Sequence, residues 1–198
     1  RGRDFAIMLA AFNQLGYSVE WRVINAADYG RAQRRRRVFF FVFRNDTKWG
    51  KRLHTKYEAT LSVDADIKSR LDCYAPYIFK DGLFGRQFPV KNEAVKKRIN
   101  ANKLDEDIAE VSANFSDGKM WNSGLMTNGY YYTIETEPKG DEEPIPMKKI
   151  VVKENQVPED YYIDGEKLEK FKYLRGPKKI TRTAANGHTY TFSEGGMS

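Results

Sequence analysis

The chain has 198 residues, of which 40% are apolar and 14% aromatic, so it can fill a core and is not a disordered chain. Its formal charge of +7 favours an anionic partner, and residues 1–56 carry the whole excess, with 13 Lys or Arg against 4 Asp or Glu. The single cysteine excludes an internal disulfide framework and suits a reducing cytoplasm. The longest apolar runs, 6–12 and 38–43, are too short to span a bilayer, so no membrane partner is expected.

The first 46 residues predict a fragment of an α/β sheet. Apolar residues recur at three- and four-residue spacing over 4–16, which predicts a helix. Residues 17–25 alternate and indicate a strand, and a loop then leads to a second strand over 38–46, whose aromatic and β-branched residues predict burial on both faces. Two strands and one helix cannot cover that apolar area, so this stretch indicates part of a larger domain that ends near residue 46.

The sequence after residue 47 predicts mixed, mainly β secondary structure. A short helix is expected over 90–104, and a hairpin over 124–136, because Asn128-Gly129 is typical of a type I′ turn. Strand-like patches follow at 150–163, then a short helix over 165–174 that Gly176-Pro177 ends. A second Asn-Gly turn, at 186–187, predicts a final hairpin strand over 188–192.

An arginine cluster, "RAQRRRR" at 31–37, lies between the two predicted strands of the first part. Such a run is often a solvated basic patch or a localisation signal, but here the flanking strands fix its loop. Alternation in an extended segment directs Gln33, Arg35 and Arg37 to one side and the intervening arginines to the other. Guanidinium groups bind phosphate and base acceptors through two parallel hydrogen bonds, so the cluster indicates a nucleic-acid site.

The stretch "NAADYGRAQRRRRVFF" resembles the region around motif VIII of the DNA (cytosine-5)-methyltransferases. The match consists of an approach segment, the signature Gln-x-Arg-x-Arg, and the apolar strand that follows it; its matching positions are Asn25, Asp28, Tyr29, Gly30, Gln33, Arg35 and Arg37. The preceding helix and "RNDT" at 44–47 also fit, as does "KKITRTAANGHTYTFSEGG", which resembles the end of the target recognition domain in bacterial members. The resemblance is strong over 1–47 and diffuse over 48–198.

The resemblance implies an enzyme that transfers a methyl group from S-adenosylmethionine to C5 of a cytosine flipped out of double-stranded DNA. By analogy, Arg37 contacts cytosine O2 and the adjacent phosphate, Arg35 holds a family glutamate and the backbone, and Gln33 supports the loop. These three are the expected catalytic residues. Such an enzyme is expected in a bacterial cytoplasm as part of a restriction-modification system. No metal site is expected, because the only histidines, His54 and His188, lie far apart and the chain has one cysteine.

The resemblance also implies a fold and a division of the chain. We expect residues 1–46 to be the end of a Rossmann-like methyltransferase sheet, and 47–198 to be a mixed, mainly β target recognition domain, truncated at its C-terminal end. The chain lacks the family's Phe-x-Gly-x-Gly, Pro-Cys and Glu-Asn-Val motifs, and Cys73 has no preceding proline and comes after the signature, which favours a buried structural thiol. We therefore expect this segment alone to bind no cofactor and to be inactive.

A recognition domain presents polar side chains to base edges and cations to phosphates. The candidate DNA-binding residues gather near the arginine run and the two Asn-Gly turns: Asn25, Tyr29, Arg31, Arg34, Thr127, Asn128, Lys179, Arg182, Thr183, Asn186, His188 and Tyr190. One alternative stays open, a non-enzymatic basic module that binds DNA or RNA. Sheet edges exposed by truncation predict possible dimerisation.

Overall fold

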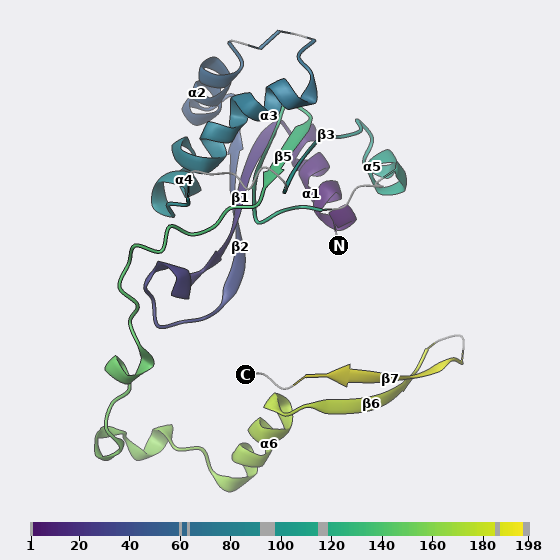
Figure 1. Cartoon of the computed structure of the whole chain (residues 1–198). Helices are drawn as coiled ribbons and strands as arrows, with labels where there is room; N and C mark the ends of the chain where they lie inside the picture. The colour runs from purple at the N-terminus through teal and green to yellow at the C-terminus, as the bar shows by residue number, and fades with distance from the viewer. Residues whose placement is uncertain are drawn as a thin grey trace. The chain divides into compact units, whose positions relative to one another are not determined.

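The computed structural model describes residues 2–59, 61–62, 64–91, 98–114, 119–184 and 187–195. The chain forms two compact units, Arg1–Lys149 and Ile150–Ser198 (Figure 1). The domain boundary expected near residue 46 stays a prediction.

The first unit is built on a five-stranded sheet with the order β2-β1-β4-β5-β3, antiparallel throughout. Its strands, in chain order, are β1 (Tyr17–Asn25), β2 (Arg36–Arg44), β3 (Ile99–Lys103), β4 (Ser123–Thr127) and β5 (Tyr130–Ile134). The fold is therefore mixed α/β, while the Rossmann-like sheet stays a prediction. The predicted strands at 17–25 and 38–46 are confirmed.

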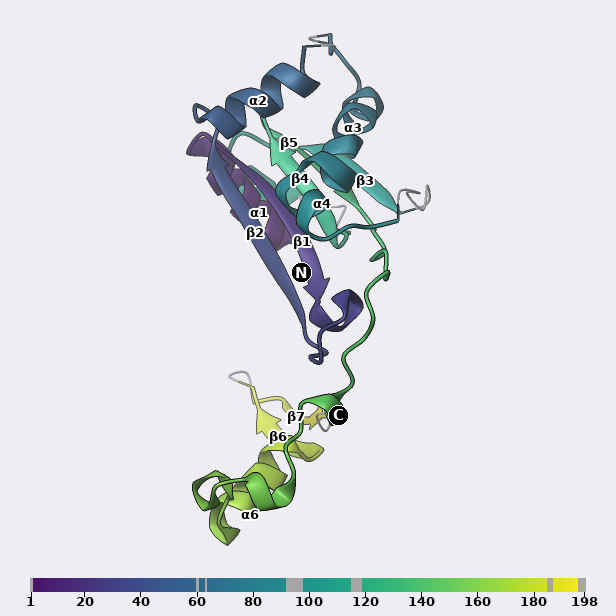
Figure 2. The same cartoon turned by 90° about the vertical axis from the view of Figure 1, so that its left-hand side faces the viewer.

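Helices cover both faces of this sheet (Figures 1 and 2). On one face lie α1 (Gly2–Gln14) and α5 (Ile108–Asn114), with a core that includes Leu9, Trp21 and Met126. On the other lie α2 (Lys48–Tyr57), α3 (Ile67–Pro76), the π-helical turn η2 (Tyr77–Asp81) and α4 (Leu83–Gln87), with a core that includes Leu53, Tyr74 and Leu125. The helix predicted over 4–16 is confirmed as α1.

The strand β1 is buried on both faces, although its sequence alternates as a half-exposed strand does. Val19 and Trp21 pack under α1, as the alternation predicts. Glu20 and Arg22 point to the opposite face, where they are only 1% and 2% exposed because η2 and α4 cover them. The side of β1 that looks polar in the sequence thus faces a second helical layer instead of solvent.

The expected burial of β2 on both faces is wrong. Val38, Phe39 and Phe40 are 45%, 48% and 37% exposed, and only Phe43 is buried. Within the described residues β2 pairs with β1 alone and is therefore an edge strand. The helices cover its C-terminal half and leave the N-terminal half, next to the arginines, open to solvent.

The hairpin predicted over 124–136 is confirmed: β4 and β5 pair across Asn128 and Gly129, whose φ angles of 48° and 76° fit a type I′ turn. The helix predicted over 90–104 is wrong in its second half, where β3 pairs with β5 from Ile99 to Lys103. Tertiary pairing with a neighbouring strand outweighs local helix propensity there. Residues 92–97 lie outside the described residues.

The second unit contains little regular structure before its helix. The strand-like patches predicted over 150–163 are wrong: two single 3₁₀ turns, η4 (Glu154–Gln156) and η5 (Glu159–Tyr161), occupy this stretch. The predicted helix is confirmed as α6 (Gly165–Arg175), which ends at Gly176. The predicted final hairpin is confirmed as β6 (Lys178–Thr183) paired with β7 (Thr189–Glu194). A 3₁₀ turn, η3 (Met147–Lys149), ends the first unit.

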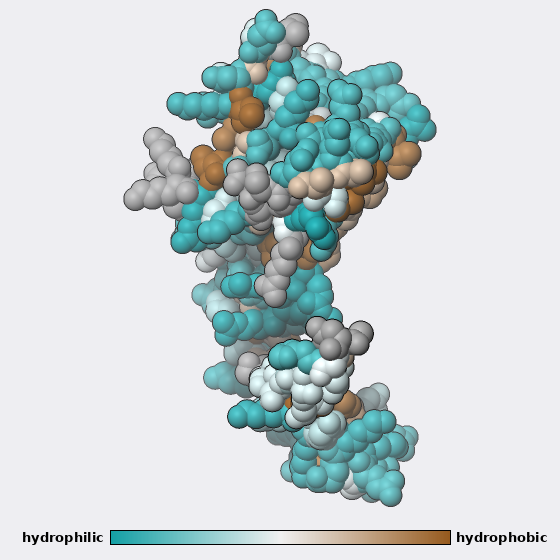
Figure 3. Space-filling view, turned by 90° about the vertical axis from the view of Figure 1, so that its right-hand side faces the viewer, coloured by the Kyte–Doolittle hydropathy of each residue, from teal (hydrophilic) through white to brown (hydrophobic). Residues whose placement is uncertain are grey.

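The surface is mostly hydrophilic on the face that Figure 3 shows, with apolar residues in separate patches. Among the described residues, none of the helices has the length and apolar content that a membrane crossing requires.

Candidate nucleic-acid interface

The loop that carries the arginines begins at a well-formed cap. Asn25 ends β1, donates from Nδ2 to Asp28 Oδ1 (2.9 Å) and accepts from the Ala27 N–H (3.4 Å), and so caps the 3₁₀ turn η1 (Ala26–Tyr29). Gly30 ends that turn with a φ of 72°, and a Cβ there would lie 3.0 Å from the carbonyl oxygen of Glu143. The Asn-x-x-Asp-Tyr-Gly segment therefore fixes the position at the end of β1 from which the arginine loop extends.

The predicted alternation of the Gln-x-Arg-x-Arg segment is present in the structure. Gln33, Arg35 and Arg37 line one cavity of about 330 Å³, whereas Arg36 lines a different hollow on the other side of β2. Arg37 pairs with Ile24 of β1, which also lines the cavity. The remaining walls come from the loop, the strand, the end of α4 and the irregular segment between β5 and η3: Ala26, Tyr29, Arg31, Phe39, Gln87, Phe88 and Glu142. We call this space the arginine cavity.

Positive charge dominates the arginine cavity. Arg31, Arg35 and Arg37 contribute three guanidinium groups, and Glu142 is the single carboxylate among the lining residues. All three arginines are solvent-exposed, and Arg37 Nη1 donates to the carbonyl of Arg36 at 2.7 Å, which restrains its side chain. Burial raises the pKa of the neighbouring Tyr29, so this phenol stays neutral and can donate a hydrogen bond. The cavity suits an anionic, hydrogen-bond-accepting ligand.

Two buried charges on β1 hold the wall that α4 supplies. Arg22 donates to the carbonyls of Phe84 (3.2 Å) and Phe88 (2.8 Å) and to that of Ile78, while Glu20 accepts from the N–H groups of Leu83 and Phe84, both at 2.9 Å. Burial raises the pKa of Glu20 and lowers that of Arg22, and each opposes the other's shift through its charge. The ring of Phe88, held in this way, packs edge-on against Tyr29 at 5.2 Å.

The structure places the other predicted residues of the first unit away from the arginine cavity. Asn25 is 7% exposed and lines the hollow that Arg36 also lines, and Arg34 is exposed on the loop. Thr127 is 1% exposed and accepts from Ser18 Oγ at 2.8 Å, so it faces the core. Asn128 donates to Glu58 Oε1 (2.6 Å) and contacts His54. A DNA contact through Thr127 has no support in this arrangement.

The predicted residues of the second unit divide between the two faces of the β6–β7 hairpin, because directly paired residues share a face. Arg182 pairs with Tyr190 beside the Ile180–Phe192 pair, and its guanidinium lies 4.4 Å from the Phe192 ring. The opposite face is wholly polar and consists of Lys179, Thr181, Thr183, Thr189, Thr191 and Ser193. His188 stacks on Tyr190 at 6.4 Å, and Asn186 lies outside the described residues.

Cys73 is half-buried and donates to the carbonyl of Tyr57, which agrees with a structural thiol. Over the described ranges, we find no group of His, Cys, Asp or Glu that could hold a metal ion.

Sequence reasoning missed the residues outside the arginine loop that complete the cavity or hold its wall. Glu20 and Arg22 looked like the solvent side of an alternating strand, and Gln87, Phe88 and Glu142 lie 50 or more positions from the arginines in sequence. The one available signal was a pair of opposite charges two residues apart on a strand otherwise rich in large apolar residues.

The chain belongs to the C-5 cytosine-specific DNA methylase family, whose model matches residues 1–188. It is 46% identical over its whole length to the Type II methyltransferase M.Sau3AI of Staphylococcus aureus, and it spans 43% of that protein. It is also 44% identical over 67 residues to the Type II methyltransferase M.MthTI of Methanothermobacter thermautotrophicus, a match that covers 34% of this chain and 18% of the relative. No solved structure matches the chain.

Proposed function

We propose that the protein carrying this chain is a DNA (cytosine-5)-methyltransferase, which moves a methyl group from S-adenosylmethionine to C5 of a flipped cytosine in duplex DNA. The observation that carries the proposal is the convergence of Gln33, Arg35 and Arg37 on one cavity, in a chain of the cytosine-specific methylase family. The Staphylococcus relative is a Type II methyltransferase, which supports a role in bacterial restriction-modification in the cytoplasm.

The arginine cavity would act on the extruded nucleotide through charge and hydrogen bonds. A base whose chemistry occurs at ring atoms must leave the helical stack, and its sugar-phosphate backbone then needs new partners. Arg37, whose side chain is held against the Arg36 carbonyl, would donate to cytosine O2 and the adjacent phosphate. Negative charge that builds at O2 during attack on the ring is stabilised by such a preorganised donor. Arg35 would hold the backbone, and Gln33 would support the loop.

The arginine cavity does not fit the cofactor. S-adenosylmethionine carries a positively charged sulfonium, and three guanidinium groups against one carboxylate would repel it. We therefore propose that the cofactor makes no contact in this cavity. The part played by these residues is to hold DNA.

We propose that the polar face of the β6–β7 hairpin contacts the target DNA. That face offers an ammonium group from Lys179 and hydroxyls such as those of Thr181 and Thr183, which suit phosphates and base edges. The other face, which includes Arg182 and Tyr190, carries the apolar pair Ile180 and Phe192 and is less suited to base readout. The recognition domain expected over 47–198 is part of this proposal.

The experiment that tests the function is methyl transfer by the full-length protein. The protein is incubated with plasmid DNA and S-adenosylmethionine, and the DNA is analysed for 5-methylcytosine by bisulfite sequencing. We expect methylated cytosine at one short recurring sequence. Tight, salt-dependent duplex binding with no methylated base under any condition would instead favour the non-enzymatic DNA-binding module.

A further inference from the structure

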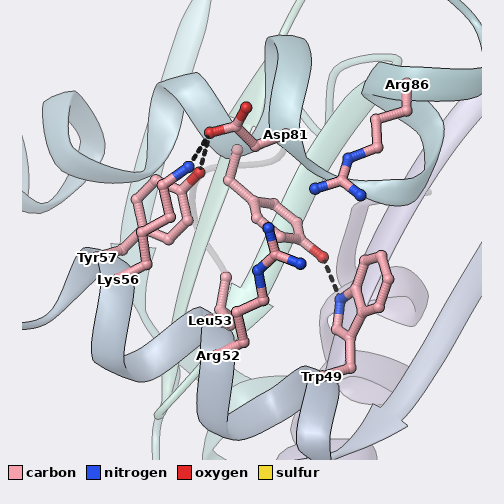
Figure 4. Close-up of a pocket in the computed structure, with 8 residues that line it drawn as sticks. Trp49, Arg52, Leu53, Lys56, Tyr57, Asp81 and Arg86 are labelled. Atoms are coloured by element: carbon pink, nitrogen blue, oxygen red, sulfur yellow. Dashed lines mark hydrogen bonds and ion pairs between the residues drawn. The ribbon is translucent and has the colours of Figure 1, made fainter.

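A second cationic hollow lies between α2 and the segment formed by η2 and α4, apart from the arginine cavity. Its lining residues are mostly cationic and aromatic: Trp49, Arg52, Leu53, Lys56, Tyr57, Tyr77, Asp81 and Arg86. Figure 4 shows the side chains of Arg52 and Arg86 reaching into it from opposite walls, so that their guanidinium groups point towards each other. We call this space the Arg52–Arg86 pocket.

The positive charge of this pocket is not balanced by its own carboxylate. Asp81 accepts hydrogen bonds from Lys56 Nζ and Tyr57 Oη, so this carboxylate is already paired with other side chains. Within the part of the chain that the structure describes, neither Arg52 nor Arg86 forms an ion pair. Two like charges that converge without a counter-charge are an arrangement that a bound anion stabilises.

The aromatic side chains shape the pocket and contribute no negative charge to it. Trp49 donates from Nε1 to Tyr77 Oη at 2.9 Å, and Arg86 lies 5.8 Å from the centre of the Trp49 ring, a contact that fixes its guanidinium. Burial and the neighbouring Asp81 raise the pKa of Tyr57, so its phenol remains neutral. The donors left for a ligand are therefore the two guanidinium groups.

The size of the pocket limits what it can hold. Its volume is about 20 Å³, against about 330 Å³ for the arginine cavity. Such a space admits about one water-sized group, so one oxygen of a phosphate group can enter between the guanidinium groups while its other oxygens stay at the mouth, and a nucleobase cannot enter. Guanidinium groups match the geometry of phosphate oxygens through paired hydrogen bonds.

We propose that the Arg52–Arg86 pocket binds a phosphate group. The surroundings favour the DNA backbone as the source of this phosphate, because the pocket and the arginine cavity lie along the same side of β2. Phe39 lines that cavity, the next residue on this side, Phe41, packs against Trp49 at 5.2 Å, and Arg86 directly precedes the cavity residue Gln87. The four residue-to-residue steps of strand from Arg37 to Phe41 span about 13 Å, which a DNA strand covers in about four nucleotides.

The first test uses inorganic phosphate and does not depend on the proposed methyltransferase function. Thermal unfolding of the full-length protein is followed as sodium phosphate replaces sodium chloride at constant ionic strength. We expect Tm to rise with phosphate, because a ligand that binds only the folded state stabilises it. The rise should be smaller in the Arg52→Gln/Arg86→Gln variant, which keeps the arginine cavity and the general stabilising effect of phosphate, and unchanged in Lys51→Gln, which removes an exposed charge from the same helix outside the pocket.

The second test identifies the source of the phosphate. Duplex affinity is measured against salt concentration for the wild-type protein and the same variants. If the site holds the DNA backbone, the double variant lowers the slope of log K against log salt by about 0.9. An unchanged slope together with a smaller phosphate effect assigns the pocket to a free phosphate compound. Absence of any phosphate-dependent rise in the wild type, or the same rise in the double variant, would overturn the proposal.

Discussion

Glu20 and Arg22 lie on the same side of β1 and hold one short segment at two points. The carboxylate of Glu20 accepts from the Leu83 and Phe84 N–H groups, where α4 begins, and the guanidinium of Arg22 donates to the Phe88 carbonyl, just beyond its end. A five-residue helix is too short to be stable alone, so this pair fixes it on the sheet. The wall of the arginine cavity depends on that attachment.

We predict that Arg22→Met lowers the free energy of unfolding by about 3–5 kcal/mol, because it leaves Glu20 buried without its partner. Urea unfolding followed by tryptophan fluorescence measures this, since the three tryptophans of the chain lie in the first unit. The Glu20→Gln/Arg22→Met double variant should lose less than the sum of the two single variants. Additive losses would show that the two side chains do not stabilise each other.

The same pair predicts a dependence of stability on pH. Burial raises the pKa of Glu20 above 4.5, so the folded state binds this proton more tightly than the unfolded state. The free energy of unfolding should therefore fall as pH rises from about 4.5 to the folded pKa of Glu20, and this contribution should be constant outside that window. In Arg22→Met the fall in the free energy of unfolding should continue to higher pH, because the charge that lowers the pKa of Glu20 is gone. In Glu20→Gln the pH-dependent contribution of this side chain should vanish. Unfolding titrations across pH 4–9 that overlay for wild type and Glu20→Gln would contradict the assignment.

Gly124 is predicted to be intolerant of any side chain. A Cβ at this position would lie 2.1 Å from Cζ2 of Trp21, in the core under α1. We expect Gly124→Ala to lower the free energy of unfolding by about 3 kcal/mol, as overpacked cores do. Adding Trp21→Phe should recover part of that loss, because the phenyl ring lacks the Cζ2 and Cη2 atoms. Strictly additive losses, measured by thermal unfolding, would argue against the clash.

The two faces of the β6–β7 hairpin give a matched pair of variants for DNA contact. Lys179→Ala should weaken duplex binding and lower its salt slope by about 0.9, because its ammonium group lies on the polar face. Arg182→Ala removes the same charge from the other face, where the guanidinium stacks on Phe192, and should change the slope little. Fluorescence anisotropy with a labelled duplex measures both. A larger effect from Arg182→Ala would place the DNA on the opposite face.

Local patterns predicted the elements that local forces decide. The type I′ turn at Asn128-Gly129 follows from the conformations that these two residue types allow, and the common direction of Gln33, Arg35 and Arg37 follows from the geometry of an extended chain.

Contacts between distant segments decided what the sequence could not show. Glu20 and Arg22 are buried because η2 and α4, about 60 residues later, cover them, and no periodicity within β1 records that layer. Conversely, the apolar run at the start of β2 predicted a central strand, but Phe39 remains exposed because β2 lies at the edge of the sheet. Burial of a strand depends on its neighbours as well as its own residues.

We propose that Arg37 acts on the reacting nucleotide and does more than attract DNA. Steady-state methyl transfer and equilibrium duplex binding are measured for the full-length protein and its Arg37→Ala variant, with Arg36→Ala, on the other side of β2, as the matched control. We predict that Arg37→Ala lowers kcat about 10²- to 10³-fold while duplex affinity falls only a few-fold, and that Arg36→Ala changes kcat little. Equal losses of turnover and affinity in Arg37→Ala, matched by Arg36→Ala, would show that these arginines supply only general attraction to DNA.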